Sequence, residues 1–366
     1  MRIAIALALV MSGSILAQDV RVRVETLPEY NAVFNTQSGW TGGDGDYSIA
    51  LSKDRILWFF SDSWIGNVRD DKHIDPWMIN NAVGIQTGIK ASEAKIEFSW
   101  GPNKKGKPTA FLVPDRGKGS FWIFGSALTR KGLFVFLQRV IKTDGKGLGF
   151  QHVGTTLANV ENPLEPPGKW RISQAELPFG SFPEQGATIY GSSVLQENGF
   201  VYIYGTSLDL SGPVRQHSPI VSRVEEADLA DFRKWRFFSN GKWVAREKEA
   251  TALTSDGSSE YSVSFVPSIG RYVMVNSRAF SRSILLRTAP TPVGEWTKPQ
   301  VIYDCPEPEI DKRVNCYAAK AHPELSSTAD ELIVSYVTNS TDFFHLASDA
   351  RIYRPRFLKV KFDTSP

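Results

Sequence analysis

The chain is dominated by short runs of β-branched and aromatic residues that alternate with turns rich in Gly, Pro, Asn and Asp. Runs of this length and composition are typical of β-strands. Helical periodicity is nearly absent, and only residues 225–235 have the pattern of a short helix, which we interpret as a connector. The clearest strand candidates are residues 56–60, 120–125, 133–141, 200–205, 271–276, 283–287 and 331–336. We therefore predict an all-β fold, which is a sandwich, a barrel or a propeller.

A loose repeat favours the propeller. Five segments share one order, namely a small-residue loop with a polar or acidic residue, a strand, a turn and an aromatic strand. They lie at residues 47–60, 121–136, 191–205, 260–275 and 322–336. Spread over residues 18–366, five units take about 70 residues each, which suits four-stranded blades with long loops. We predict a single five-bladed β-propeller over residues 18–366.

The two ends of this predicted domain have matching patterns. Residues 20–24 alternate apolar and basic side chains, and residues 357–362 do the same. Pairing these segments would remove an exposed sheet edge. We expect both ends of the domain to contribute strands to one blade.

The N-terminus reads as a secretory signal peptide over residues 1–17. Arg2 is followed by a short apolar run at residues 3–11 and by small residues up to Ala17. The apolar run is too short to span a bilayer, and we find no later segment that is apolar enough. We expect a secreted or periplasmic protein.

The charge balance is nearly neutral. The formal net charge is +3, with 22% charged residues and no run of like charges. This is too weak to indicate nucleic acid or an anionic membrane as a partner. We expect a monomer.

Two cysteines, Cys305 and Cys316, are the only ones in the chain. In an exported protein such a pair most simply forms one disulfide, and two free thiols or half a metal site are the alternatives. The five histidines are scattered without metal-ligand spacing. We expect a disulfide, no metal centre and no cofactor.

The stretch from Trp40 to Gly66 carries the strongest chemical signal. Asp44 lies in a glycine-rich turn, and Asp62 follows the aromatic run at residues 57–60. Glycoside hydrolysis needs two carboxyl groups, one that donates a proton and one that acts as base or nucleophile. We predict that Asp44 and Asp62 form this pair, with Asp46 as a nearby substrate-binding acid or a competitor of Asp44. The alternative is that these acids only hydrogen-bond their own turns.

Three further polar residues lie at the inner edges of predicted blades. Glu260 precedes one aromatic unit, and a buried carboxyl group there would suit a general acid. His322 and Glu324 occupy the matching place in the last unit, and we assign them to substrate binding. For all three, a solvated or locally bonded side chain is the alternative.

Other side chains are candidates for direct sugar contact. Trp40 and Trp64 flank the acidic loops and could stack on sugar rings, although most aromatic side chains in an all-β protein belong to the core. Asn81, beside Asn80, could bind hydroxyl groups on the same rim. Arg223 could clamp a hydroxyl or carboxylate group, and its alternative is a surface ion pair.

The motif GWTGGDGDYSIAL followed by ILWFFSDSWIG resembles a widespread family of exported bacterial proteins with a domain of uncharacterised function. Part of that family looks like glycoside hydrolase family 183, which includes endo-D-arabinanases with a five-bladed propeller. The resemblance implies that Asp44 and Asp62 are the paired catalytic aspartates. Ser61 and Ser63 depart from the Gly and Thr usual in the family, so arabinan specificity does not transfer.

Three functions remain open from the sequence. The leading hypothesis is an exported glycoside hydrolase that acts on a polysaccharide with Asp44 and Asp62, supported by Glu260. The second is a propeller that binds carbohydrate without cleaving it. The third is a propeller that binds other proteins. The sequence has no G-x-S-x-G elbow and no phosphate-binding loop, so other common chemistries lack support.

Overall fold

The computed structural model describes residues 20–143, 149–212, 215–278 and 281–363. The predicted signal peptide, residues 1–17, lies outside these ranges. The described chain is all-β with a few short helices, as predicted.

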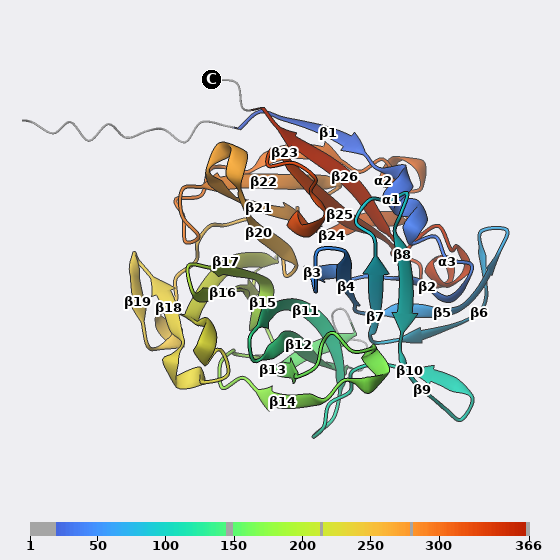
Figure 1. Cartoon of the computed structure of the whole chain (residues 1–366), viewed down its shortest axis with the longest axis horizontal. Helices are drawn as coiled ribbons and strands as arrows, with labels where there is room; N and C mark the ends of the chain where they lie inside the picture. Colours follow the sequence, from blue (N-terminus) through green and yellow to red (C-terminus); the bar gives the residue numbers. More distant parts are fainter. Residues whose placement is uncertain (1–19, 144–148, 213–214, 279–280, 364–366) are drawn as a thin grey trace, which may run out of the picture.

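Five antiparallel sheets follow one another along the chain, and we call them sheets I to V (Figure 1). Sheet I contains β3 (Tyr47–Ala50), β4 (Arg55–Phe60), β7 (Ala82–Thr87) and β8 (Lys95–Ser99). Sheet II contains β11 (Ser120–Thr129), β12 (Gly132–Lys142), β13 (Phe150–Val160) and β14 (Ile172–Glu176). Sheet III contains β15 (Gly186–Glu197), β16 (Phe200–Asp209), β17 (Gln216–Glu225), β18 (Arg236–Ser239) and β19 (Lys242–Val244). Sheet IV contains β20 (Tyr261–Val266), β21 (Arg271–Ser277), β22 (Ser283–Ala289) and β23 (Gln300–Asp304).

Sheet V is completed by the start of the described chain. Its strands are β24 (Val314–Ala321), β25 (Glu331–Ser340), β26 (Pro355–Phe362) and β1 (Val22–Thr26). In the antiparallel register, Val22 lies opposite Phe362 and Thr26 lies opposite Leu358. The predicted pairing of the two ends is confirmed, and it covers the edge that β26 would otherwise expose.

Smaller elements precede the five sheets or lie between their strands. A three-stranded sheet contains β2 (Ser38–Gly43), β5 (Ser63–Arg69) and β6 (Lys72–Ile79). A hairpin pairs β9 (Gly101–Lys104) with β10 (Lys107–Thr109). The short helices are α1 (Pro28–Val33), α2 (Glu307–Ile310) and α3 (Phe343–Ser348).

The first strands of the five sheets lie next to one another in order, and the first strand of sheet V lies beside that of sheet I (Figure 1). Between sheets I and II, the Tyr47 and Phe124 rings stack with centroids 5.5 Å apart, and between sheets II and III the Leu128 amide donates to Gln196 Oε1 at 3.1 Å. Between sheets III and IV, the Val263 amide donates to the Ser193 hydroxyl oxygen at 2.9 Å, and between sheets IV and V the Ala321 amide donates to the Ser262 hydroxyl oxygen at 2.7 Å. Between sheets V and I, His322 Nδ1 lies 2.5 Å from the Ser48 hydroxyl oxygen. A cavity of about 580 Å³ lies between these strands and is lined by residues of all five. The chain thereby places the loops that precede the first strands around one central space.

The largest buried apolar cluster joins sheets I, II and III. It includes Leu57 on β4, Phe136 on β12, Ile203 on β16 and Trp235 before β18. The aromatic strand candidates of the sequence are therefore core strands, in accord with the free energy gained when aromatic surface leaves water.

The prediction of one continuous helix over residues 225–235 is wrong. The segment forms two separate 3₁₀ turns, Glu226–Asp228 and Phe232–Lys234. The Asp231 side chain accepts a hydrogen bond from the Arg233 backbone, which caps the second turn and interrupts a continuous helix.

The predicted disulfide between Cys305 and Cys316 is also wrong, because both cysteines are free and buried. Helix α2 lies between them and brings the Glu307 carboxylate to 3.8 Å from the Cys316 sulfur. The hydrogen bond with Cys305, burial and the Glu307 charge raise the pKa of the Cys316 thiol well above its usual range. The Cys316 thiol thus lies against the Glu307 carboxylate and is not bonded to Cys305.

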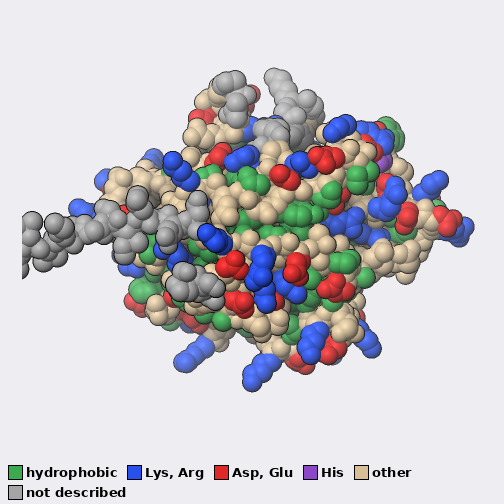
Figure 2. Space-filling model, turned by 90° about the horizontal axis from the view of Figure 1, so that it is seen from above, with side chains coloured by type: hydrophobic (Ala, Val, Ile, Leu, Met, Phe, Trp, Pro, Cys, Tyr) green, Lys and Arg blue, Asp and Glu red, His purple; other side chains and the backbone are tan. Residues whose placement is uncertain are grey.

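The surface carries charges of both signs. Figure 2 shows basic and acidic side chains interspersed on the face seen from above Figure 1. Within the described ranges, no helix has the length and apolar character needed to cross a membrane.

A chain that begins at Leu27 tests the closure of sheet V. It lacks β1, so Val20, Val22 and Val24 no longer pack against the cluster that contains Leu358. Losing three half-buried valines removes roughly 3 kcal/mol of stability and lowers the Tm by roughly 5 °C. The measurement is thermal unfolding followed by circular dichroism. Arg23→Ala is the control, because it removes only an exposed ion pair with Asp363. An unchanged Tm in the shortened chain contradicts the account.

Candidate active site

Asp44 and Asp62 are held on two backbone segments that hydrogen-bond to each other. The Asp44 amide donates to the Asp62 carbonyl oxygen at 3.1 Å, and the Ser61 amide donates to the Asp44 carbonyl oxygen at 2.8 Å. Gly45 has φ +84°, and a Cβ atom there would lie 2.9 Å from the Ser61 nitrogen. Glycine is therefore required for this close approach. The turn that follows β2 and the loop that follows β4 thus present the two acids together.

The Asp44 carboxylate is bound by two tyrosine hydroxyl groups from sheet V and the segment that follows its β25. Oδ2 accepts from Tyr317 at 2.5 Å and from Tyr353 at 2.8 Å, whereas Oδ1 is buried without a partner among the described residues. Burial raises the pKa of Asp44 to about 6, and the two hydroxyl donors oppose that rise. Both donors stabilise the ionised form of Asp44.

Only one of the two carboxylate oxygens of Asp62 has hydrogen-bond partners among the described residues. Its Oδ1 atom accepts from Asn80 Nδ2 and from Trp122 Nε1, each at 3.1 Å, and Oδ2 has no partner among the described residues. Burial first, and then the negative charge of Asp44, raise the pKa of Asp62 to about 7. Asp62 therefore exchanges a proton near neutral pH.

A buried lysine lies between two further acids. Lys320 Nζ is 3.2 Å from Asp46 Oδ1 and 3.7 Å from Glu260 Oε1, and it donates to the Ala318 carbonyl oxygen at 2.6 Å. Lys320 is 2% exposed and Asp46 is fully buried. Burial raises the pKa of Glu260 to about 7, although the Lys320 charge opposes the shift.

The charges of these groups act on one another. The charge of Asp44 contributes to the raised pKa of both Asp62 and Glu260. Buried carboxyl groups that repel one another cannot all be ionised at neutral pH, so protons are shared among them. Such a cluster can supply a general acid and a general base at the same pH.

His322 and Glu324 form a network beneath this cluster. The Ser48 hydroxyl lies 2.5 Å from His322 Nδ1 and donates to the Glu324 carboxylate, and the Ser335 hydroxyl lies 2.7 Å from His322 Nε2 and donates to Asp46. Burial, followed by the Lys320 charge, holds the pKa of His322 well below its usual range. His322 therefore connects Asp46 with sheet I, and its two nitrogens are occupied by protein groups.

Two predicted stacking residues are corrected. Trp40 is 1% exposed, and its ring stacks on Phe98 at 4.4 Å. Trp64 is 3% exposed and packs against Phe343 at 6.0 Å between ring centroids. Their ring faces are covered by the core and do not stack on a ligand.

Asn81 and Arg223 are also placed away from substrate. The Asn81 amide donates to the carbonyl oxygens of Leu112 and Phe121, each at 2.9 Å, so it joins sheet I to the start of sheet II. Arg223 lies on β17, where its guanidinium group is 4.6 Å from the Phe200 ring and 4.2 Å from the Trp243 ring. Both side chains are structural.

Sequence reasoning missed Trp122, Tyr317, Lys320 and Tyr353. They come from sheets II and V, and they meet Asp44, Asp46 and Asp62 only through long-range packing. The sequence contained one indication of Lys320, which lies two residues before His322 in a segment already identified as a candidate for substrate binding.

One group of side chains has metal-ligand chemistry in the described part of the chain. Ligand atoms of Cys305, Glu307 and Cys316 lie within 4.8 Å of one another. The Glu307 carboxylate is already bound by the Tyr336 hydroxyl at 3.0 Å and lies 3.7 Å from Arg356. Protein groups therefore compensate its charge.

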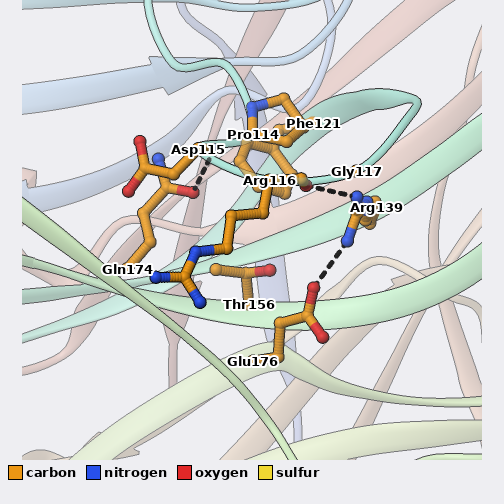
Figure 3. A pocket seen from close by; sticks show the side chains of 9 residues that line it. All are labelled: Pro114, Asp115, Arg116, Gly117, Phe121, Arg139, Thr156, Gln174 and Glu176. Atoms are coloured by element: carbon orange, nitrogen blue, oxygen red, sulfur yellow. Dashed lines mark hydrogen bonds and ion pairs between the residues drawn. The ribbon is translucent and has the colours of Figure 1, made fainter.

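A second cavity, of about 620 Å³, lies against sheet II (Figure 3). Arg139 points into it and is held by Glu176 at 2.6 Å and by the Lys118 carbonyl oxygen at 2.9 Å. Gln174 binds the backbone of Val113 and Asp115. These contacts fix the loop at residues 113–118 to the sheet, and Glu176, one of the two acids that line the cavity, is paired with Arg139. The carboxyl cluster around Asp44 is therefore the stronger candidate site.

A family model identifies the chain. DUF5005, a domain of unknown function, matches residues 28–362, so the chain belongs to this family. No curated protein matches it in sequence.

Solved structures share the fold. A proposed hydrolase from Bacteroides ovatus ATCC 8483 superposes with a TM-score of 0.73 at 20% sequence identity, covering 93% of this chain and 90% of that chain. Zg3597, a family 117 glycoside hydrolase produced by the marine bacterium Zobellia galactanivorans, superposes with a TM-score of 0.50 at 10% identity, covering 94% and 91%. At these identities the likeness concerns the fold.

Replacing the buried lysine tests the charge balance of the site. Lys320→Met leaves Asp46 buried without its cation, so we expect a loss of about 3 kcal/mol or more in the free energy of unfolding. Urea denaturation at pH 7 measures it. Lys361→Met is the control, because its ion pair with Asp330 at 3.9 Å is exposed, and we expect a loss below about 1 kcal/mol. Equal losses in the two variants contradict the assignment.

The raised pKa of Asp62 predicts a pH-dependent stability difference. Between pH 4 and about pH 7 the folded carboxyl group retains a proton that the unfolded chain has released, so its contribution to stability is lost as the pH rises through 7. Asp62→Asn cannot ionise. Its Tm relative to wild type should therefore be higher at pH 8 than at pH 5.

The exposed Asp115 provides the matched control for this titration. The Tm difference between Asp115→Asn and wild type should stay constant between pH 5 and pH 8. A constant difference for Asp62→Asn as well means that Asp62 does not titrate near neutral pH.

Proposed function

We propose that this protein is an exported glycoside hydrolase that cleaves a polysaccharide with Asp44 and Asp62, supported by Glu260. The observation that carries the proposal is the cluster of half-buried carboxyl groups with pKa values raised to about 6, 7 and 7. Isolated carboxyl groups ionise in water near pH 4. Carboxyl groups whose pKa values are raised well above this cluster at functional sites.

The roles follow from the hydrogen bonds. Two hydroxyl donors favour the ionised form of Asp44, which suits a base or nucleophile. Asp62 has the higher pKa and an oxygen without a protein partner, which suits a general acid that protonates the leaving oxygen. The charges of Glu260 and Asp44 repel each other, and the Lys320 charge opposes the raised pKa of Glu260.

The proposed architecture is a single five-bladed propeller with the site at the ends where the first strands begin. Contacts between successive first strands support it, as does the pairing of β1 with β26. The fold likeness to a family 117 glycoside hydrolase agrees with this architecture. The sequence pattern of residues 1–17 supports export to the periplasm or the medium.

The substrate class rests on the site and on the resemblance of residues 39–66 to a family that contains arabinanases. A polysaccharide panel with arabinan, arabinogalactan, xylan and agarose covers the open choices. We expect wild type to release reducing ends from at least one of them. Asp44→Asn and Asp62→Asn should each lower kcat by about 100-fold or more, since general acid–base catalysis contributes that much.

Two variants control this experiment. Glu260→Gln should lower kcat less than either aspartate variant, because it acts through charge. Asp115→Asn, in the second cavity, should leave activity unchanged. Activity that persists in both aspartate variants overturns the assignment. Binding without any product marks a carbohydrate-binding propeller instead.

A further inference from the structure

Trp122 connects Asp62 to a group of side chains that the proposed chemistry does not use. Trp122 on β11 donates to Asp62 through its indole nitrogen. Phe150 and His152 on β13 pack against Trp122, with ring centroids at 4.5 Å and 5.9 Å from it. Trp122, Phe150 and His152 are all half-buried, so parts of these rings face the solvent.

His217 joins this group from sheet III. It lies on β17 in the neighbourhood of His152: burial, followed by the repulsion between the protonated forms of the two rings, lowers the pKa of His152 to about 4. The His217 carbonyl oxygen accepts a hydrogen bond from the Gly257 amide at 3.0 Å. Gly257 is three residues from Glu260, so His217 borders the loop that carries the third acid.

Both imidazoles have an unsatisfied nitrogen. The Nδ1 atoms of His152 and His217 are buried and have no hydrogen-bond partner, and no hydrogen bond to either Nε2 atom is found among the described residues. In His322, by comparison, both ring nitrogens lie within hydrogen-bond distance of serine hydroxyl groups. Burial lowers the pKa of His217 to about 4 as well, so both rings are neutral at neutral pH.

Neutral imidazoles beside an aromatic surface match one ligand chemistry. Each neutral ring offers one donor and one acceptor nitrogen, as a sugar hydroxyl group does. Indole and phenyl faces pack against the apolar face of a sugar ring. The imidazoles themselves carry no charge at neutral pH, so they bind a ligand through hydrogen bonds.

We infer that Trp122, Phe150, His152 and His217 form a sugar-binding subsite that extends from Asp62 toward the loop of Glu260. The exposed edges of the two imidazoles, which carry Nε2, bind hydroxyl groups of the sugar that flanks the cleaved bond. This inference rests on the proposed function for its ligand class. It assigns binding to these residues and leaves the proton transfers to the carboxyl groups.

Variants that keep ring volume but lose the polar nitrogens test the subsite. His152→Phe and His217→Phe should each raise KM on the polysaccharide that wild type cleaves by about fivefold, the worth of one hydrogen bond between neutral groups. The kcat should stay within about twofold, because no reacting atom is touched. His152→Gln and His217→Gln place an amide near the Nε2 position and should restore most of the affinity.

His345→Phe is the matched control. His345 lies on α3 and pairs with Asp311 and Asp349, each at 3.7 Å. The KM of the His345→Phe variant should equal that of wild type. Circular dichroism and the Tm confirm that each variant is folded.

A binding assay separates this inference from the proposed hydrolysis. Isothermal titration calorimetry with arabinohexaose, xylohexaose and agarohexaose in the Asp44→Asn background, in which hydrolysis is slowed most, measures affinity with little turnover. Weaker binding in the Phe variants, with recovery in the Gln variants, supports the subsite even if wild type cleaves nothing. Affinity and KM unchanged in both Phe variants overturn the subsite while leaving hydrolysis intact. Binding of none of the three probes, with KM unchanged, overturns it too.

Discussion

The buried Lys320 ammonium group is the interaction on which the candidate site depends. It comes from the first strand of sheet V, and it binds Asp46 before sheet I and Glu260 before sheet IV. A lone buried charge is strongly unfavourable, so the cation and its two acids stabilise one another only when the three segments converge. The same ammonium group lines the central cavity and lies over the Tyr47 ring at 4.5 Å. The position of the acids is therefore tied to the assembly of the sheets.

The members of the carboxyl cluster have different hydrogen-bond and ion-pair partners. Asp46 is paired with a cation, Asp44 is held by two hydroxyl groups, and Asp62 receives only two neutral N–H donors. Glu260 also lies beside Lys320, and burial still raises its pKa to about 7, so burial and hydrogen-bond partners together decide the protonation of each acid. One backbone motif, the turn at residues 43–46 bonded to residues 61–62, thus presents acids with different roles.

The sequence predicted what local patterns determine. Strand composition gave the all-β class, the alternation at both ends gave the β1–β26 pair, and the glycine-rich turn pointed to Asp44 and Asp62. Local patterns did not predict the long-range partners of Asp44. Tyr317 and Tyr353 bind Asp44 across about 270 and 310 residues of chain, and their own sequence surroundings do not indicate this contact. Trp40 and Trp64 were misassigned because an aromatic residue beside a polar loop has the same local sequence whether it packs inward or faces a ligand. The cysteine pair failed because the position of Glu307 between the cysteines depends on a helix that spacing does not reveal.

The central claim is that carboxyl groups in one site retain protons near neutral pH. Carbon-13 NMR of protein labelled at the side-chain carboxyl carbons measures each titration directly, with Asp62→Asn and Glu260→Gln to assign the signals. The account predicts midpoints near 7 for Asp62 and Glu260 and near 6 for Asp44. Midpoints near 4 for all three groups would show that they are ordinary solvated acids, and would contradict the proposed acid–base function.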